Sequence, residues 1–426
     1  VGLTRRLAAA ALLLAVAAAT AGAVPMAGTV EVHDELGTLI DTKSGADAIR
    51  DALGAVQAQR GSDARPWALA IGAGTYGDAA ITQRNLTVAA DPPGSAVIAG
   101  YGGADDTGGG CIDITRGAVT LDGIVCRGAA RTGINVTPPN AEGGIVLRGI
   151  AVDGTGVDGI AVTGGTGIVI ADAVVTATKR DGIRLTSLTA AGPYAITGGS
   201  VSGAGQDGLR LADDVARLDV TGFRATGNAV DGIASEDSGT SDISLVGVTA
   251  SSNARNGVIM SGGGLRIGLR DSVVSGNTGA GVRLGDGSGF GLAGMTLDGS
   301  NGGGDLLFTA DPRTGGAYVG LDAGGGFSLI GEPSAVRVSG VPAARMGIVA
   351  PTAGGRARSG AVLSIGATAV VASRRAVVRF DRGAAVWRGA GKWAKVPSSR
   401  RIKGGMQAIL GTSLLGTARA TYAPFG

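Results

Sequence analysis

Asp181-Gly182-Ile183-Arg184-Leu185 belongs to a series of five-residue units that recur through the middle of the chain. The second residue of the unit falls at positions 133, 159, 182, 208, 232, 257, 281 and 305, so the seven intervals average about 24.6 residues. A repeat of this length predicts a solenoid, in which each unit buries its apolar face only against the units before and after it.

Each repeat holds three short stretches in which apolar and polar residues alternate, as is typical of β-strands. In the five-residue unit, Ile183 and Leu185 are predicted to point inward and Arg184 outward. A second alternating run, such as residues 168–170, lies about a dozen residues earlier, and a third short strand separates the two. Three short strands without room for a crossover helix predict a parallel β-helix.

An asparagine stands four residues before the second position of the unit in four consecutive repeats: Asn228, Asn253, Asn277 and Asn301. Stacked coils would align these side chains in one column, where each amide finds hydrogen-bond partners above and below it. With these features, residues 65 to 330 resemble the right-handed parallel β-helix proteins of the pectate-lyase-like superfamily. The resemblance implies an all-β fold, a right-handed parallel β-helix of about ten coils.

The chain divides into four predicted segments. Arg5 and Arg6 precede an apolar stretch and small residues, a pattern typical of a secretory signal peptide. An amphipathic helix over 44–59 would cover the open end of the solenoid. The predicted segments are the signal peptide 1–23, an N-terminal cap 24–64, the β-helix 65–332 and a basic, β-rich C-terminal domain 333–426. We therefore expect a bacterial protein that is secreted or attached to the cell surface, without a membrane span in its mature form.

Charge is distributed unevenly along the chain. Residues 333–426 carry 15 Lys and Arg against one acid, a net charge of +14, whereas the preceding 332 residues carry 22 against 33, a net charge of −11. The basic end is either a solvated surface or a contact for a polyanion, with Trp387 and Trp393 as stacking platforms for a substrate. Nucleic acid is not expected as a partner, because the sequence contains no nucleic-acid-binding motif.

Two cysteines, Cys111 and Cys126, are the only ones in the chain. In an exported protein such a pair predicts a disulfide that joins adjacent coils; two buried thiols are the alternative. The single histidine, His33, lies before the repeats. The histidine motifs of polygalacturonases and pectate lyases are therefore missing, and so is the Asp-Pro-His-Glu run of alginate epimerases.

A candidate substrate face follows from the outward position of the unit. Arg184 and Arg210 occupy this position in consecutive repeats, so their strands would lie about 4.8 Å apart. If the protein is a polysaccharide lyase, a basic side chain must remove a proton from the sugar, and the candidates are Lys179, Arg184 and Arg210. Further candidates for substrate binding nearby are Arg180, Asp207 and Asp231.

A column of aspartates stands beside this face: Asp158, Asp181, Asp207 and Asp231. Carboxylates stacked about 4.8 Å apart repel each other by about 1 kcal/mol in water, and by more in a less polar setting. Turn amides, flanking arginines or a bound cation must offset this repulsion. The structural interpretation is Asp-Gly turn chemistry. The functional one is a Ca²⁺ site built from Asp181, Asp207, Asp213 and Asp214 that neutralises the carboxylate of a substrate.

Two functions remain open at this point. The first, which we expect, is a monomeric protein that binds an acidic polysaccharide, with cleavage by β-elimination as an open extension of binding. The second is a non-catalytic surface or adhesion scaffold that its basic C-terminal domain tethers to an envelope polymer. The missing catalytic motifs favour the second function, and the superfamily resemblance favours the first.

Overall fold

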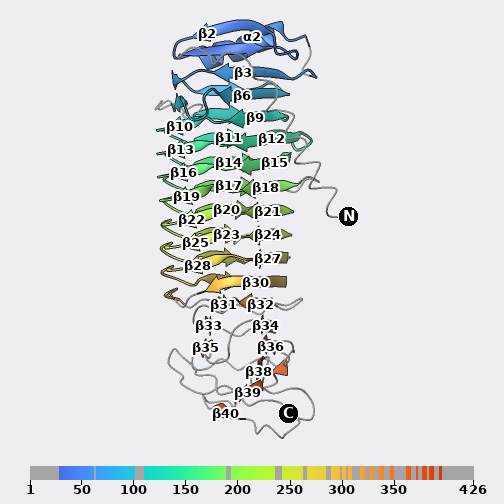
Figure 1. The fold of residues 1–426 in the computed structure, drawn as a ribbon, viewed down its shortest axis with the longest axis vertical. Helices are drawn as coiled ribbons and strands as arrows, with labels where there is room; N and C mark the ends of the chain where they lie inside the picture. Colours follow the sequence, from blue (N-terminus) through green and yellow to red (C-terminus); the bar gives the residue numbers. More distant parts are fainter. Residues whose placement is uncertain are drawn as a thin grey trace.

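The computed structural model describes residues 28–61, 64–100, 110–188, 193–235, 242–261, 266–284, 289–297, 300–303 and 306–308, and beyond these only the strands between residues 317 and 395. The expected signal peptide lies outside the described residues. The described chain forms an elongated stack of coils, each built from up to three strands (Figure 1).

Stack C contains the strand of the five-residue unit and forms a sheet of twelve parallel strands among the described residues. Its strands are β5 (Ala79–Ile81), β8 (Ile112–Ile114), β11 (Ile134–Val136), β14 (Ile160–Thr163), β17 (Ile183–Thr186), β20 (Leu209–Ala212), β23 (Ile233–Ser235), β26 (Val258–Met260), β29 (Val282–Leu284), β31 (Leu306–Phe308), β33 (Phe327–Ile330) and β35 (Met346–Val349).

Stacks A and B lie on either side of stack C in Figure 1. The strands of stack A are β3 (Trp67–Ile71), β6 (Leu86–Ala90), β9 (Val119–Asp122), β12 (Gly143–Arg148), β15 (Thr166–Ala171), β18 (Tyr194–Thr197), β21 (Leu218–Thr221), β24 (Ile243–Val246), β27 (Arg266–Arg270), β30 (Gly289–Leu297), β32 (Ala317–Leu321), β34 (Ala335–Ser339) and β36 (Ala361–Ile365). The strands of stack B are β4 (Gly74–Tyr76), β7 (Ala96–Ala99), β10 (Val125–Arg127), β13 (Ala151–Asp153), β16 (Val174–Thr176), β19 (Ser200–Ser202), β22 (Arg224–Thr226), β25 (Thr249–Ser251) and β28 (Val273–Ser275).

The interior of the stack is narrow and aliphatic. Ile183 and Leu185 are buried and pair in register with Leu209 and Leu211 of the next coil. Each coil buries its inward side chains against the coils before and after it, which stabilises the fold by about 25 cal/mol per Å² of apolar surface removed from water. Gly182 fits because a Cβ there would lie 2.1 Å from Cγ1 of Val201, closer than two carbons can approach.

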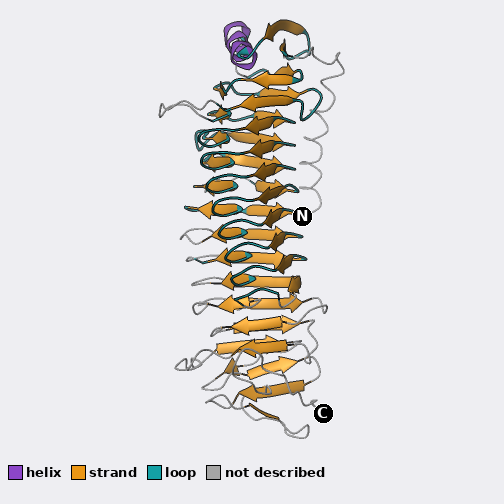
Figure 2. Cartoon of the chain, turned by 90° about the vertical axis from the view of Figure 1, so that its left-hand side faces the viewer, coloured by secondary structure: helices purple, strands orange, loops and turns teal. Residues whose placement is uncertain are grey.

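The N-terminal end is covered as the sequence predicted. Helix α2 (Ala48–Gln59) buries Ile49, Leu53 and Val56 against the first strands, and it lies at one end of the stack (Figure 2). An antiparallel hairpin of β1 (Thr29–His33) and β2 (Leu39–Ser44) accompanies it, and β1 also pairs with β3. The cap therefore supplies partners to a strand edge that would otherwise be open.

Parallel pairing continues beyond residue 332, since β34 pairs with β32 and β36 pairs with β34. The short strand β37 (Val371–Ala372) then pairs antiparallel with β36. Three further strands form a small antiparallel sheet: β38 (Val377–Phe380), β39 (Gly383–Trp387) and β40 (Trp393–Lys395). The division of the chain at residue 333 stays a prediction.

Candidate functional site

Arg184 and Arg210 are directly paired on β17 and β20, at the outward position of stack C. Both side chains are partly exposed, at 31% and 20%. Each also reaches an aspartate three residues earlier on its own coil: Nη1 of Arg184 lies 3.5 Å from Oδ2 of Asp181, and Nη1 of Arg210 lies 3.3 Å from Oδ2 of Asp207. The arginine pair thus has a fixed position on the surface.

The aspartate column is a hydrogen-bonded ladder, which we call the aspartate ladder. Oδ1 of each member accepts the main-chain N–H of the next: Asp158 from Asp181 at 3.1 Å, Asp181 from Asp207 at 3.2 Å and Asp207 from Asp231 at 2.9 Å. Asn256 ends the series by donating its main-chain N–H and its amide to Oδ1 of Asp231. Turn amides therefore stabilise the carboxylates, but they come from the following coil.

Every ladder aspartate also contacts an arginine. Asp158 accepts hydrogen bonds from Arg180 of the next coil, through Nε at 2.7 Å and through Nη2. Asp231 accepts from Nε of Arg255 at 3.0 Å and from its Nη2. Together with Arg184 and Arg210, these arginines offset the repulsion between stacked carboxylates.

The electrostatic balance is least favourable in the middle of the ladder. Burial raises the pKa of Asp207 to about 6; the N–H of Asp231 counteracts this, and the charges of Asp231 and Asp181 add to the rise. Burial also raises the pKa of Asp181, against the hydrogen bond from Asp207. The ladder therefore holds at least one carboxyl that takes up a proton in mildly acidic solution.

The expected substrate-binding and catalytic residues lie at different depths. Lys179 is exposed in the turn before β17, and no ion pair involves it within the described part of the chain. Arg180, beside it, is committed to Asp158. Asp207 and Asp231 are almost fully buried, at 4% and 0%, so both carboxylates belong to the ladder rather than to the outer surface.

The structure does not bring the four predicted calcium ligands together. Asp213 and Asp214 are exposed at the end of β20, with positive φ angles of 48° and 53°. Asp207 precedes the other end of this four-residue strand, about 13 Å away. Among the described residues, no group of three His, Cys, Asp or Glu side chains could hold a metal ion. The residues present therefore do not fit a calcium site.

The outer face of stack C changes character along its length. At the outward position, Nδ2 of Asn135 donates to Oδ1 of Asp113 at 3.1 Å, and both side chains are half-buried. In the coils after Arg210 the same position holds Ala234 and Ile259, which are fully buried although they face outward. The polar part of the face therefore comprises this position on β8, β11, β17 and β20, interrupted by Ala161 on β14, and Arg283 follows separately on β29.

Some predicted residues lie partly outside the described structure. The backbones of Trp387 and Trp393 pair on β39 and β40, but their side chains are outside the described residues. The four asparagines of the column all lie within the described residues and form a ladder: Nδ2 donates to the next Oδ1 at 2.9 Å from Asn228 to Asn253, 2.9 Å from Asn253 to Asn277 and 2.8 Å from Asn277 to Asn301.

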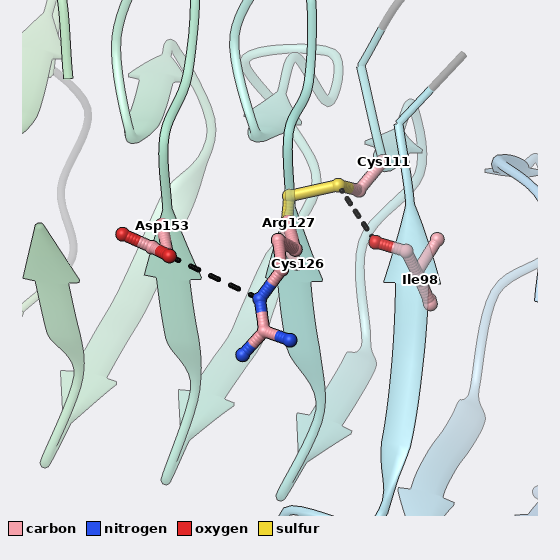
Figure 3. The surroundings of a disulfide bond; sticks show 5 residues. All are labelled: Ile98, Cys111, Cys126, Arg127 and Asp153. Carbon is pink, nitrogen blue, oxygen red and sulfur yellow. Dashed lines mark hydrogen bonds and ion pairs between the residues drawn. A yellow bond between two sulfur atoms is a disulfide. The ribbon is translucent and has the colours of Figure 1, made fainter. Parts of the chain in front are cut away.

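Cys111 and Cys126 form a disulfide, with their Cα atoms 5.8 Å apart (Figure 3). Cys111 precedes β8, and Cys126 lies on β10. Arg127, the residue after Cys126, forms an ion pair of 3.9 Å with Asp153 on the neighbouring strand β13 (Figure 3). The bond joins two early coils next to the polar part of the face.

The sequence analysis missed several contacts that join successive coils. These include the Asn135–Asp113 hydrogen bond and the convergence of Arg84 and Arg116 on Glu142. Residues 113 and 135 share the outward position of the repeat, so their spacing of 22 residues was a usable signal. Glu142 lies in a turn of irregular length, where the period gives no register.

Residues 123–301 match a family model described as the right handed beta helix region. Two solved structures with a similar fold are the A-modules of the mannuronan C-5 epimerases AlgE6 and AlgE4 of Azotobacter vinelandii. The AlgE6 module has a TM-score of 0.53 at 16% identity, over 71% of this chain and 89% of that one. The AlgE4 module has a TM-score of 0.50 at 15% identity, over 75% and 89%. No curated protein sequence matches the chain.

The three stacks and these matches identify the fold as a right-handed parallel β-helix, as the sequence resemblance implied. At identities this low, the similarity establishes the fold alone. Within the described residues, no helix has the length and apolar character needed to cross a membrane.

Proposed function

We propose that the chain binds an acidic polysaccharide along the outer face of stack C, centred on Arg184 and Arg210. The observation that carries the proposal is the register of β17 and β20, which places the two arginines directly beside each other on the surface. Guanidinium groups bind carboxylates through paired hydrogen bonds, and a polymer of acidic sugars presents carboxylates at regular intervals.

Two further features support this proposal. Asn135 and Asp113 offer hydrogen-bonding groups to sugar hydroxyls a few coils away on the same face. The similar folds of two enzymes named mannuronan C-5 epimerases support a polyuronate as the class of polymer. The chain lacks the Asp-Pro-His-Glu run, so epimerase chemistry is not part of the proposal.

A cleavage step by β-elimination would extend the binding function. In this reaction a base removes the proton at C5 of the uronate, a C4–C5 double bond forms, and the bond from C4 to the glycosidic oxygen breaks as that oxygen takes a proton from water. Lys179 is the candidate base, because it is exposed and within five residues of Arg184. A guanidinium has no lone pair free to remove a proton at ordinary pH, so Arg184 and Arg210 suit binding of the substrate better than proton removal.

Binding is tested by substituting both arginines. The double variant Arg184→Ala/Arg210→Ala should bind polygalacturonate or polymannuronate at least about tenfold more weakly than the unmodified protein, measured by calorimetry at low salt. Arg127→Ala/Arg224→Ala is the matched control, since it removes the same charge from stack B. Equal losses in both variants would indicate a response to net charge and would refute the proposed face.

Cleavage is tested separately by ultraviolet absorbance of unsaturated products from a panel of polyuronates. If β-elimination occurs, Lys179→Ala should abolish the signal and leave binding of the polymer nearly unchanged. If the unmodified protein produces no signal on any polymer, the binding function remains and the protein is a non-catalytic scaffold.

A further inference from the structure

A second group of arginines lies at the corner between stacks C and A, in the first coils of the β-helix. Arg84 follows β5 and Arg116 follows β8, and both turn toward Glu142, which follows β11 one coil beyond Arg116 and two coils beyond Arg84. Nε of Arg84 lies 3.7 Å from Oε2 of Glu142, and Nη2 of Arg116 lies 3.2 Å from Oε1. We call Arg84, Arg116 and Glu142 the arginine corner.

The charges of the arginine corner do not balance. Two guanidinium groups share one carboxylate, and Oε2 of Glu142 also accepts the main-chain N–H of Gly117 at 2.8 Å. Nε of Arg84 and Nε of Arg116 are buried and have no hydrogen-bond partner within the part of the chain that the structure describes. The two arginine side chains remain 43% and 38% exposed, so an anion from solution can reach them.

A buried arginine, Arg60, fixes the main chain at Arg84. Arg60, which is 9% exposed, donates through Nη1 to the carbonyl oxygen of Arg84 at 2.5 Å and through Nη2 to that of Asn85 at 3.3 Å. Arg60 thereby holds the turn and adds a third positive charge next to it. These bonds fix the main chain of the turn, so the point from which the Arg84 side chain extends is set before a ligand binds.

Another ion pair on the surface has one carboxylate for one guanidinium group. Arg148 on β12 faces a single partner, Asp122 on β9, and donates to it through Nε at 3.0 Å and through Nη2. That one-to-one pair uses the donors of the guanidinium on one carboxylate. In the arginine corner, by contrast, two guanidinium groups share the single carboxylate of Glu142.

We propose that Arg84 and Arg116 form a second carboxylate-binding subsite, which takes an acidic sugar unit of the polymer. This inference rests on the proposed function, because it assigns the same ligand to a second place along stack C. Three strand steps separate β8 from β17, a distance of about 14 Å, so a single extended polymer can reach both arginine pairs. Two subsites on one chain raise the affinity for a long polymer over that for a short one.

The test compares binding of a short galacturonate oligomer, a long polygalacturonate and a carboxyl-reduced oligomer, all by calorimetry. Arg84→Ala/Arg116→Ala should weaken binding of the long polymer at least about tenfold, whereas Arg148→Ala should leave it within about twofold. The carboxyl-reduced oligomer should bind to none of the proteins. Unfolding temperatures are measured in parallel, so that a loss of folding is distinguished from a loss of binding.

Glu142→Gln supplies the sharper variant. It keeps an oxygen for the N–H of Gly117 but removes the charge that competes with the ligand, so binding of the polymer should become several-fold tighter. A purely structural arginine corner would give unchanged or weaker binding. Unchanged binding in Glu142→Gln together with unchanged binding in Arg84→Ala/Arg116→Ala would refute the subsite.

The outcomes separate this inference from the proposed function. If the polymer binds and only Arg184→Ala/Arg210→Ala weakens it, the face is right and the second subsite is wrong. If only Arg84→Ala/Arg116→Ala weakens it, the second subsite stands and the proposed centre of the face is wrong. If the unmodified protein binds no acidic polymer, both proposals fail.

Discussion

The aspartate ladder places carboxylates where they are costly. A buried carboxylate loses its hydration and is tolerated only when hydrogen bonds and opposite charges replace the water. Asp158 and Asp231 receive two donors from one arginine each, whereas Arg210 contacts Asp207 at 3.3 Å and Asp207 lies between two other acids. The raised pKa of Asp207 is the measurable consequence of this difference.

Substituting Asp207 should therefore change the pH dependence of stability. The folded state holds the proton of Asp207 up to about pH 6, whereas an unperturbed aspartate releases it near 3.8. Folding is thus favoured below pH 3.8, and this contribution is lost as pH rises to about 6. Asp207→Asn should be more stable than the unmodified protein at pH 7 by about 1–3 kcal/mol, and the difference should shrink toward pH 4.

Urea unfolding at several pH values measures this difference. Asp219→Asn, at an exposed position on β21, is the control and should change little across the same range. If Asp207→Asn and the unmodified protein showed parallel pH profiles, the carboxyl of Asp207 would not be perturbed.

A substitution in the asparagine ladder should lower the free energy of unfolding, whereas Asp207→Asn should raise it. Oδ1 of Asn253 accepts from Nδ2 of Asn228, and its own Nδ2 donates to Asn277 and to the carbonyl oxygen of Ala225. Asn253→Ala would leave these buried groups without a partner, at a cost of about 2–3 kcal/mol in the free energy of unfolding. Asn135→Ala, at a half-buried position with one such bond, should cost less than half as much in thermal or urea unfolding.

Residue-scale features differ in how far the sequence determines them. The asparagine column was visible because four amides recur at a fixed place in the repeat, and a buried amide at such a place has few other partners. The arginines of the aspartate ladder could not be assigned in the same way. Arg180 and Arg255 reach back to the preceding coil, while Arg184 and Arg210 stay on their own, and the repeat period does not distinguish the two choices.

At the scale of the coil, the glycine that follows each ladder aspartate, such as Gly182 after Asp181, lets successive coils approach closely. A Cβ at Gly182 would meet both Cγ1 of Val201 at 2.1 Å and the carbonyl oxygen of Gly208 at 2.8 Å. Gly182→Ala should lower the free energy of unfolding by about 1–3 kcal/mol or more, because neither the core nor the next coil can move away.

Gly268→Ala is the matched control for this substitution. It lies on β27, where an added Cβ would meet no atom within 4 Å, so thermal unfolding should show little change. Replacing Gly by Ala lowers the entropy of the unfolded chain and by itself favours folding, so a similar loss in both variants would mean that crowding between coils is not the cause.

The disulfide acts on the early coils as a unit. A closed loop of about 15 residues is expected to stabilise the folded state by about 3 kcal/mol, because it restricts the unfolded chain. Cys111→Ser/Cys126→Ser should therefore unfold at lower urea concentration, and a reducing agent should affect only the unmodified protein. Equal unfolding midpoints in both proteins under oxidising conditions would contradict this expectation.

The order of elements was predictable, but the face they present was only partly so. Alternation and period gave three strands per repeat and the inward and outward residues of β17 and β20. They did not show that Ala234 and Ile259 are buried at the outward position, since contacts on the outside of the coils are not periodic. The predicted grouping of Asp207 with Asp213 and Asp214 ignored the length of β20, which holds them apart.

The described part of the chain is a stack in which each coil contacts mainly its neighbours, so that a substitution in one coil acts locally. Acidic residues predominate up to residue 332 and basic residues beyond it, with net charges of −11 and +14. Such an asymmetry favours a polyanion as the partner of the basic end through long-range attraction. The polymer-binding face and the basic end would then serve two purposes, recognition and retention.

Removing residues 333–426 tests this division of roles. The truncated protein should lose retention on isolated cell walls, because 15 of the 37 basic residues are removed, but it should keep its affinity for soluble polyuronate. Retention of the full chain should fall steeply as salt rises from about 0.05 to 0.5 M, since screening shortens the range of the attraction. Circular dichroism of the truncated protein checks that the coils remain folded. Unchanged retention after truncation would assign cell-wall binding to the coils themselves.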